Sequence, residues 1–99
     1  MYLVNTSFAV EPCVRDRWLA LVSEHYVPLL TKRGFKVVAL SRVVSIEPVD
    51  HFTYSLLVEV EDMARYEEFT QEVFEQYLSL VQPVVGSRVV WFTTLMKKL

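Results

Sequence analysis

The sequence predicts an α+β fold from two observations on its periodicity. Apolar residues recur at every second position in four segments, and at every third or fourth position in two longer segments. These segments follow one another as strand, helix, strand, strand, helix and strand, with few residues between them. That order is the ferredoxin-like βαββαβ unit, in which a four-stranded antiparallel sheet carries two helices on one face. We therefore expect one domain over residues 1–99.

The first and third predicted strands each have two unlike faces, because side chains alternate across a strand. In Tyr2–Val10 and in Phe52–Val60, one face is bulky and apolar while the other is small and partly polar. The bulky faces comprise Val4, Thr6, Phe8 and Val10, and Tyr54, Leu56, Val58 and Val60; the smaller faces comprise Leu3, Asn5, Ser7 and Ala9, and Thr53, Ser55, Leu57 and Glu59. We expect these strands to be central neighbours whose bulky faces form the core beneath the helices.

The first predicted helix begins at Pro12, since proline suits the first helical position. Its apolar stripe is Val14, Trp18, Leu21, Val22, Leu29 and Leu30. Pro28 interrupts this pattern, and its ring would collide with the carbonyl group of Glu24. We expect a bend or a break near His25–Val27, and an end to the helix at Gly34.

The second predicted helix begins after Asp62, a suitable N-cap residue. Its buried stripe is expected to comprise Met63, Tyr66, Phe69, Val73, Phe74, Tyr77, Leu78, Leu80 and Val81. Pro83 is expected to stop this helix, and Gly86 and Ser87 then turn the chain into the last strand.

A hairpin is predicted between the helices, and an edge strand at the end of the sequence. The hairpin pairs Phe35–Ile46 with Phe52–Val60 through a turn at Glu47–His51, where proline and aspartate favour tight geometry. The last strand is expected over Val89–Met96, with Trp91 and Phe92 on opposite faces. A strand that is large and apolar on both sides indicates a covered second face.

The apolar content is high for so small a domain. Hydrophobic residues make up 53 % of 99 residues, although small domains have a large surface to cover with polar groups. A homodimer interface would use this excess, and a small apolar ligand is the alternative. We expect the interface on the smaller faces of the two central strands, through Leu3, Asn5, Ser7, Thr53, Ser55 and Leu57.

Charge and ligand types argue against several partners. The net charge is −2, and Glu67, Glu68, Glu72 and Glu75 crowd the second helix with only Arg65 in opposition, which disfavours nucleic acid and anionic membranes. The single cysteine fits a reducing compartment, so we expect a cytoplasmic protein. His25 and His51 lie far apart, and there is no CxxC motif, so we expect neither a metal site nor a cofactor.

Five residues are candidates for a small-molecule pocket: Asn5, His25, Tyr26, Arg42 and Tyr54. They are polar groups on otherwise apolar segments, which is how binding pockets fix the orientation of a ligand. Small polar residues also let two sheets hydrogen-bond across a seam, which needs no ligand. The sequence leaves open whether the protein is an enzyme.

Short motifs along the whole chain resemble an uncharacterised bacterial domain-of-unknown-function family of similar length. They are Tyr26-Val27-Pro28, Gly34-Phe35, Thr53-Tyr54-Ser55 and Val89–Leu95. The resemblance implies a dimeric α/β-barrel protein, in which two ferredoxin-like sheets pack face to face. The wider group includes cofactor-independent monooxygenases, with pockets between the sheet and the helices of each subunit.

Three hypotheses follow from the sequence. The first is a cytoplasmic homodimer without an assigned activity, and the second is a monooxygenase-like enzyme or small-molecule-binding protein. The third is a regulatory module of the ACT type, which shares the order of elements. ACT domains usually have a glycine after the first strand, where this chain has Val10-Glu11-Pro12, so this hypothesis ranks last.

Overall fold

The structure, a computed structural model, describes residues 1–44 and 50–99. Within these residues the strands, helices and helical turns follow one another along the chain in the order β1 (Tyr2–Val10), η1 (Pro12–Val14), α1 (Arg15–Leu21), η2 (Val22–Tyr26), α2 (Val27–Lys32), β2 (Lys36–Arg42), β3 (Phe52–Val60), α3 (Met63–Glu68), η3 (Phe69–Val73), α4 (Phe74–Val85), η4 (Gly86–Arg88) and β4 (Val89–Lys97). Here η1 and η4 are 3-10 turns, and η2 and η3 are π-helical turns.

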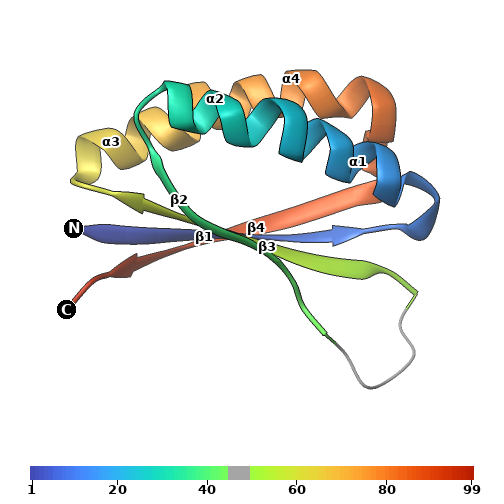
Figure 1. The fold of residues 1–99 in the computed structure, drawn as a ribbon, viewed down its shortest axis with the longest axis horizontal. Helices are drawn as coiled ribbons and strands as arrows, with labels where there is room; N and C mark the ends of the chain where they lie inside the picture. The colour runs from blue at the N-terminus through green and yellow to red at the C-terminus, as the bar shows by residue number, and fades with distance from the viewer. Residues whose placement is uncertain (45–49) are drawn as a thin grey trace.

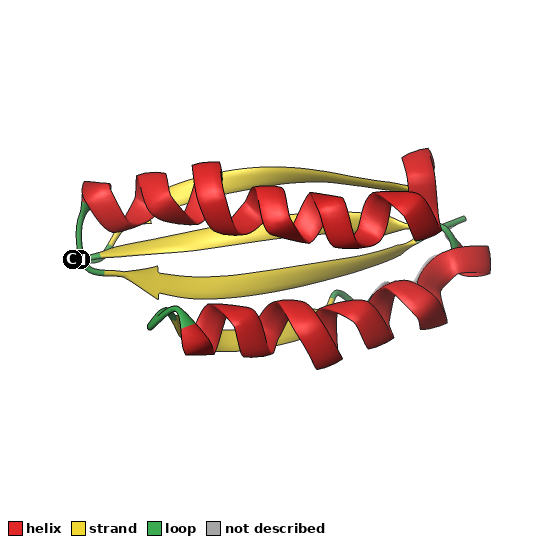
Figure 2. Ribbon diagram, turned by 90° about the horizontal axis from the view of Figure 1, so that it is seen from above, coloured by secondary structure: helices red, strands yellow, loops and turns green. Residues whose placement is uncertain are grey.

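The four strands form one antiparallel sheet in the order β2-β3-β1-β4. Two helical segments, one from α1 to α2 and the other from α3 to α4, lie side by side over the same face of the sheet (Figures 1 and 2). The opposite face carries no helix (Figure 1). The predicted ferredoxin-like α+β fold is confirmed.

The core lies between the sheet and the helices, as the alternation along the two central strands predicts. Val4, Phe8, Leu56 and Val58 are fully buried beneath the helices. The polar Thr6 on the same face is also fully buried. Each Å² of apolar surface removed from water contributes about 25 cal/mol to stability. Because the bulky apolar side chains lie on this face of the sheet, the helices pack here.

The first helical segment passes Pro28 without a break. The irregularity expected near His25–Val27 is the π-helical turn η2, in which the Val27 amide donates to the Val22 carbonyl group five residues earlier. Because Pro28 donates no backbone hydrogen bond, a wider turn ahead of it relieves the contact between its ring and the preceding carbonyl groups. The segment ends at Gly34, whose positive φ of 84° favours glycine.

The second helical segment differs from the prediction at both ends. Asp62 caps α3 as expected, since its carboxylate accepts a hydrogen bond from the Arg65 amide. Met63 was assigned to the buried stripe, but it is 43 % exposed, so that assignment is wrong. The prediction that Pro83 stops the helix is also wrong, because α4 continues to Val85.

Pro83 is tolerated because it lies on the exposed side of the last turns of α4. Proline there removes one hydrogen bond to the carbonyl group of Ser79, and both residues face solvent, so that water can bind the carbonyl oxygen. Gly86 ends the helix instead, with a φ of 57°.

Two strands have bounds that differ from the prediction. The strand β2 is Lys36–Arg42 and is shorter than expected, with an irregular register between Val37 and Ala39. Ile46 and part of the predicted turn, residues 47–49, lie outside the described residues. The strand β4 includes one more residue than predicted, and its Trp91 and Phe92 lie on opposite faces as expected, opposite Phe8 and Ser7 respectively.

Candidate functional site

The face of the sheet that carries no helix, here called the open face, consists of four rows of side chains that cross the strands β2, β3, β1 and β4. The register gives these rows as Lys36, Glu59, Leu3 and Met96; Ala39, Leu57, Asn5 and Thr94; Ser41, Ser55, Ser7 and Phe92; and Val43, Thr53, Ala9 and Val90. Among these residues only Lys36 and Glu59 are charged, and both lie in the first row. An antiparallel sheet face in contact with water is normally polar along its length, so this face is unusually poor in charge.

A small hydrogen-bonded cluster occupies the centre of the open face. The Ser55 hydroxyl donates to the Asn5 side-chain oxygen across β3 and β1. The Asn5 amide nitrogen donates to the Ser7 hydroxyl at 3.3 Å. These three side chains are half-buried and satisfy one another, so the centre of the face presents few unpaired polar atoms to a surface that covers it.

Large apolar side chains on β4 and at the end of β2 surround this centre. Phe92 is 66 % exposed and Val90 is 59 % exposed, and both lie on the open face. Val43 and Met96, at opposite ends of the face, are also exposed. Phe92 and Val90 adjoin one another on this face, and neighbouring large exposed apolar groups are typical of an interaction site.

A groove of about 260 Å³ lies at one end of the open face, between the end of β1 and the starts of β3 and β4. Its lining residues are Ser7, Phe8, Ala9, His51, Thr53, Val90, Trp91 and Phe92. His51 is one of these lining residues, and its Nδ1 is 2.9 Å from a carboxylate oxygen of Asp50. That hydrogen bond holds the pKa of the Asp50 carboxyl below its ordinary value.

The five predicted pocket residues do not come together in one site. Asn5 lies on the open face, whereas Tyr26 and Tyr54 are buried on the helix side of the sheet. Arg42 lies exposed at the end of β2, opposite Tyr54 in the register, so these two are neighbours, and His25 lies exposed in η2. The six predicted interface residues, by contrast, all lie on the open face: Leu3, Asn5, Ser7, Thr53, Ser55 and Leu57.

Aromatic rings pack against one another between the sheet and the helices. The Trp18 ring nitrogen donates to the Tyr77 hydroxyl at 2.8 Å, and the Tyr77 ring centre lies 4.7 Å from that of Tyr26. All three side chains are at most 1 % exposed. Burial raises the pKa of Tyr77 to about 12 and raises the pKa of Tyr26 well above its ordinary value. These hydroxyls therefore stay neutral at physiological pH.

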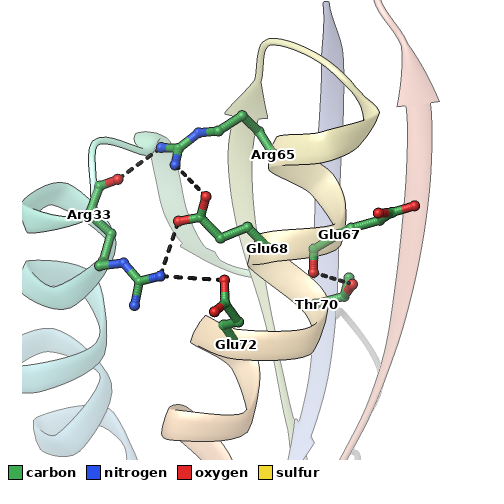
Figure 3. A network of polar contacts seen from close by, with 6 residues as sticks. All are labelled: Arg33, Arg65, Glu67, Glu68, Thr70 and Glu72. Carbon is green, nitrogen blue, oxygen red and sulfur yellow. Dashed lines mark hydrogen bonds and ion pairs between the residues drawn. The ribbon is translucent and has the colours of Figure 1, made fainter.

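The acidic face of the second helical segment has more basic partners than the sequence indicates. Glu68 accepts from Arg65 at 2.8 Å and from Arg33 at 3.1 Å, and Arg33 also lies 3.7 Å from Glu72 (Figure 3). The sequence predicted only Arg65 in opposition. Arg33 was missed because it lies 35 positions before Glu68, at the end of the other helical segment.

This ion cluster joins the two helical segments at one end of the molecule. Arg65 also donates to the Arg33 carbonyl oxygen at 2.8 Å, and its guanidinium group lies 4.0 Å from the centre of the Phe35 ring. Burial tends to raise the pKa of Glu68, but hydrogen bonds from Arg65 and Arg33 outweigh it and hold that pKa below its ordinary value of 4.5.

We expect the Glu68 cluster to make stability depend on pH in the acid range. A carboxyl group whose pKa is lowered by folding stabilises the fold fully above its ordinary pKa, and loses that contribution as the pH falls through the folded value. Thermal unfolding followed by circular dichroism should therefore show a smaller loss of Tm between about pH 7 and about pH 3 in Glu68→Gln than in the wild type. Glu75→Gln, an exposed position on α4, is the control. Equal losses in Glu68→Gln and the wild type would contradict this account.

Across residues 1–44 and 50–99, no group of three or more His, Cys, Asp or Glu side chains is placed to hold a metal ion. In the same residues, no helix has the length and apolar character needed to cross a membrane.

Comparison with known proteins gives one family and several similar structures. The family described as "Domain of unknown function (DUF4286)" matches residues 1–99. Protein Atu4242 from Agrobacterium tumefaciens has a TM-score of 0.74 and is 13 % identical, with 100 % of this chain and 94 % of that chain covered. An antibiotic biosynthesis monooxygenase has a TM-score of 0.62 at 20 % identity, with 100 % and 99 % covered.

A dimeric ferredoxin-like protein from an uncultured marine organism is also similar in structure. Its TM-score is 0.56 at 14 % identity, with 99 % of this chain and 95 % of that chain covered. No curated protein matches the chain. At these identities the likeness concerns the fold, and it supports the ferredoxin-like assignment without giving an activity.

Proposed function

Because the chain belongs to the family of domains of unknown function DUF4286, which carries no assigned activity, we propose its function from the geometry of the open face. We propose that the protein acts as a homodimer whose two subunits pack these faces against each other. The single observation that carries the proposal is that one sheet face lacks a covering helix and has no charged residue in its second, third and fourth rows.

The chemistry of the open face suits a second copy of the same chain. A two-fold interface brings the same patch of both subunits together, so the patch must be compatible with itself. Small polar groups at the centre and apolar groups such as Phe92 and Val90 at the edge meet this condition, whereas an excess of one charge would not. Stable interfaces bury about 800 Å² on each partner, so we expect all four rows of the open face to take part. The similar structure described as dimeric is consistent with this assembly.

Native mass spectrometry of the purified protein tests the proposal directly. The subunit mass is 11.6 kDa, and we expect the principal species to have twice that mass across a dilution series down to low micromolar concentrations. A denaturing spectrum of the same sample reports any retained small molecule as a difference in mass. A principal species at the mass of one subunit at every concentration would contradict the proposed dimer.

Small-molecule binding is the second candidate function, and the groove beside Phe92 is the observation that favours it. In the monooxygenase-like version of this hypothesis, the ligand lies between the sheet and the helices. Tyr26, Tyr77 and Trp18 occupy that region in this chain. We therefore place a ligand on the open face, as the alternative to a second subunit packed there, and assign no oxygenase chemistry.

Two further statements belong to the same proposal. We propose that residues 1–99 act as one domain, because β1 and β4 from the two ends of the chain are paired neighbours in the sheet. We also propose a cytoplasmic location, because Cys13 is an exposed free thiol and a reducing compartment would keep it so.

A further inference from the structure

The groove at the end of the open face has apolar walls of a size that suits a small flat molecule. Its volume is about 260 Å³, below the roughly 300–1,000 Å³ of sites for drug-sized ligands. Val90, Phe92 and Ala9 give it an apolar lining, while Ser7 and Thr53 provide hydroxyl groups. This space matches one aromatic ring or a fused pair of rings.

The geometry of His51 determines which polar group such a molecule should carry. Nδ1 lies 2.9 Å from the ionised Asp50 carboxylate, so Nδ1 carries the proton and donates to it. In the neutral ring, Nε2 is then the acceptor. Among the described residues, Nε2 has no hydrogen-bond partner. The hydrogen bond to Asp50 therefore leaves Nε2 of a groove-lining residue as the acceptor for a ligand.

The charges beyond His51 indicate the charge of the ligand. A second hollow adjoins the groove, shares Ala9, His51 and Val90 with it, and is also lined by Glu11, Asp50 and Arg88. Arg88 lies 3.6 Å from Glu11, so its charge is already opposed, and Asp50 is ionised beside the histidine. A negatively charged ligand would meet carboxylates here without an unpaired cation, which disfavours it.

We propose that this groove binds a small uncharged aromatic molecule that donates one N–H or O–H hydrogen bond to Nε2 of His51, with its ring against Phe92. This inference rests on the proposed small-molecule binding, which is the alternative to the dimer because a second sheet on the open face would cover Ser7, Thr53 and Phe92. It adds the position of the site and the class of ligand. His51 acts here as a binding residue, and the sequence prediction that used Asn5, His25, Tyr26, Arg42 and Tyr54 did not include it.

Indole and 1-methylindole are a matched pair of probes, because they differ in the single N–H group that the proposal uses. Each is titrated into the uniformly ¹⁵N-labelled full-length protein, and amide chemical shifts are followed by NMR. We expect indole to shift the amides of Ser7, Thr53 and Phe92, and to bind about tenfold more tightly than 1-methylindole.

Two substitutions test whether the difference in affinity between indole and 1-methylindole depends on His51. His51→Phe keeps a ring in the groove lining but removes the acceptor, so the two probes should bind this variant with equal affinity. His25→Phe makes the same change at the other histidine of the chain, which lies exposed in η2, and should keep the tenfold preference. Phe92→Ala should weaken the binding of both probes.

The possible failures separate the two levels of the proposal. If both probes shift the groove amides with equal affinity in the wild type, the ligand class is wrong and small-molecule binding in the groove stands. If neither probe shifts these amides up to its solubility limit, the groove is not a binding site and both proposals fail. A preference for indole that persists in His51→Phe would overturn the role of His51.

Discussion

The variant Ser55→Glu is expected to be a folded monomer under conditions in which the wild type is a dimer. Ser55 lies on the central strand β3 in the third row of the open face, and its hydroxyl donates to Asn5. A two-fold axis places a second Ser55 on the facing sheet, so the substitution introduces two carboxylates into one interface. Each buried charge without a partner costs about 3–5 kcal/mol, which raises the Kd of the dimer by several orders of magnitude.

The fold of one subunit should survive this change, because Ser55 is on the face opposite the core. In the monomer a glutamate at position 55 would be in contact with water, and the Asn5 amide nitrogen could donate to it. Native mass spectrometry and far-ultraviolet circular dichroism of the same sample measure assembly and folding separately. Ser55→Ala removes the hydroxyl without adding charge, and should remain dimeric.

A glutamate elsewhere on the surface provides the matched control. Ser23→Glu adds the same charge at an exposed position of the helical layer, and should leave the dimer intact. The proposed interface would be wrong if Ser55→Glu and Ser23→Glu gave the same dimer fraction across the dilution series. Loss of the dimer in both variants would indicate an effect of net charge, with no role for the open face.

The two faces of the sheet could be predicted because they depend on local alternation. Successive side chains of a strand point to opposite sides, so Val4 and Phe8 share one face while Leu3 and Asn5 lie on the other. The chain also has just two segments with helical periodicity, and both have to cover the apolar face. Alternation therefore indicated the core, and it also placed the six candidate interface residues on the open face.

The two wrong predictions along the helices follow from sequence rules that take no account of how exposed the residue is. Pro83 was predicted to stop the helix. The hydrogen bond lost on the water-facing side costs less free energy than the burial of Val81 and Val85 on the other side contributes. Met63 fits the spacing of the apolar stripe, but it is the first residue of α3 and lies past the edge of the core. Periodicity gives the phase of a buried face, and it gives no information on how far along the helix the burial extends.

The candidate pocket could not be predicted as a group, because its members depend on contacts between distant segments. Tyr26 and Tyr54 contain polar atoms, yet their rings belong to the core, and a sequence does not show whether a buried tyrosine lines a cavity or fills one. His51 was weighed only as a metal ligand. Its spacing of two from Thr53 places it in phase with the open face, and its neighbour Asp50 can orient the ring, so a signal was present in the sequence.

Trp18→Ala is expected to cause the largest loss of stability of any substitution considered for this chain. Trp18 is fully buried, and its ring centre lies 5.1 Å from that of Phe8 on β1 and 5.0 Å from that of Tyr54 on β3. Its ring nitrogen donates to Tyr77 on α4. One side chain thus joins the first helical segment to both central strands and to the second helical segment.

Two contributions add to the loss of stability in the Trp18→Ala variant. Truncation of a buried aromatic ring costs about 3–5 kcal/mol through lost transfer energy and the cavity left behind. The Tyr77 hydroxyl loses its donor while it stays buried, which costs about 1–3 kcal/mol more. Because small domains are stable by only about 5–15 kcal/mol, this variant should be largely unfolded in moderate urea and should lose tens of degrees in Tm.

Graded substitutions separate the cavity from the hydrogen bond. Trp18→Phe keeps most of the ring volume but removes the donor, so its loss should be smaller than that of Trp18→Ala. Tyr77→Phe in the Trp18→Phe background removes the buried hydroxyl, and should recover part of the loss, because the two apolar rings leave no unpaired group. Trp91→Ala is the matched control at a tryptophan that is 38 % exposed on the edge strand, and should cost much less.

Urea unfolding followed by circular dichroism, at one protein concentration for all variants, measures these differences with the same contribution from mass action. An equal loss in Trp18→Ala and Trp91→Ala would contradict the central role given to Trp18. Such a result would also weaken the assignment of function, because the ligand is placed on the open face on the ground that Trp18, Tyr26 and Tyr77 occupy the region between the sheet and the helices. The stability of this aromatic core and the placement of the ligand on the open face are therefore tested by the same substitution.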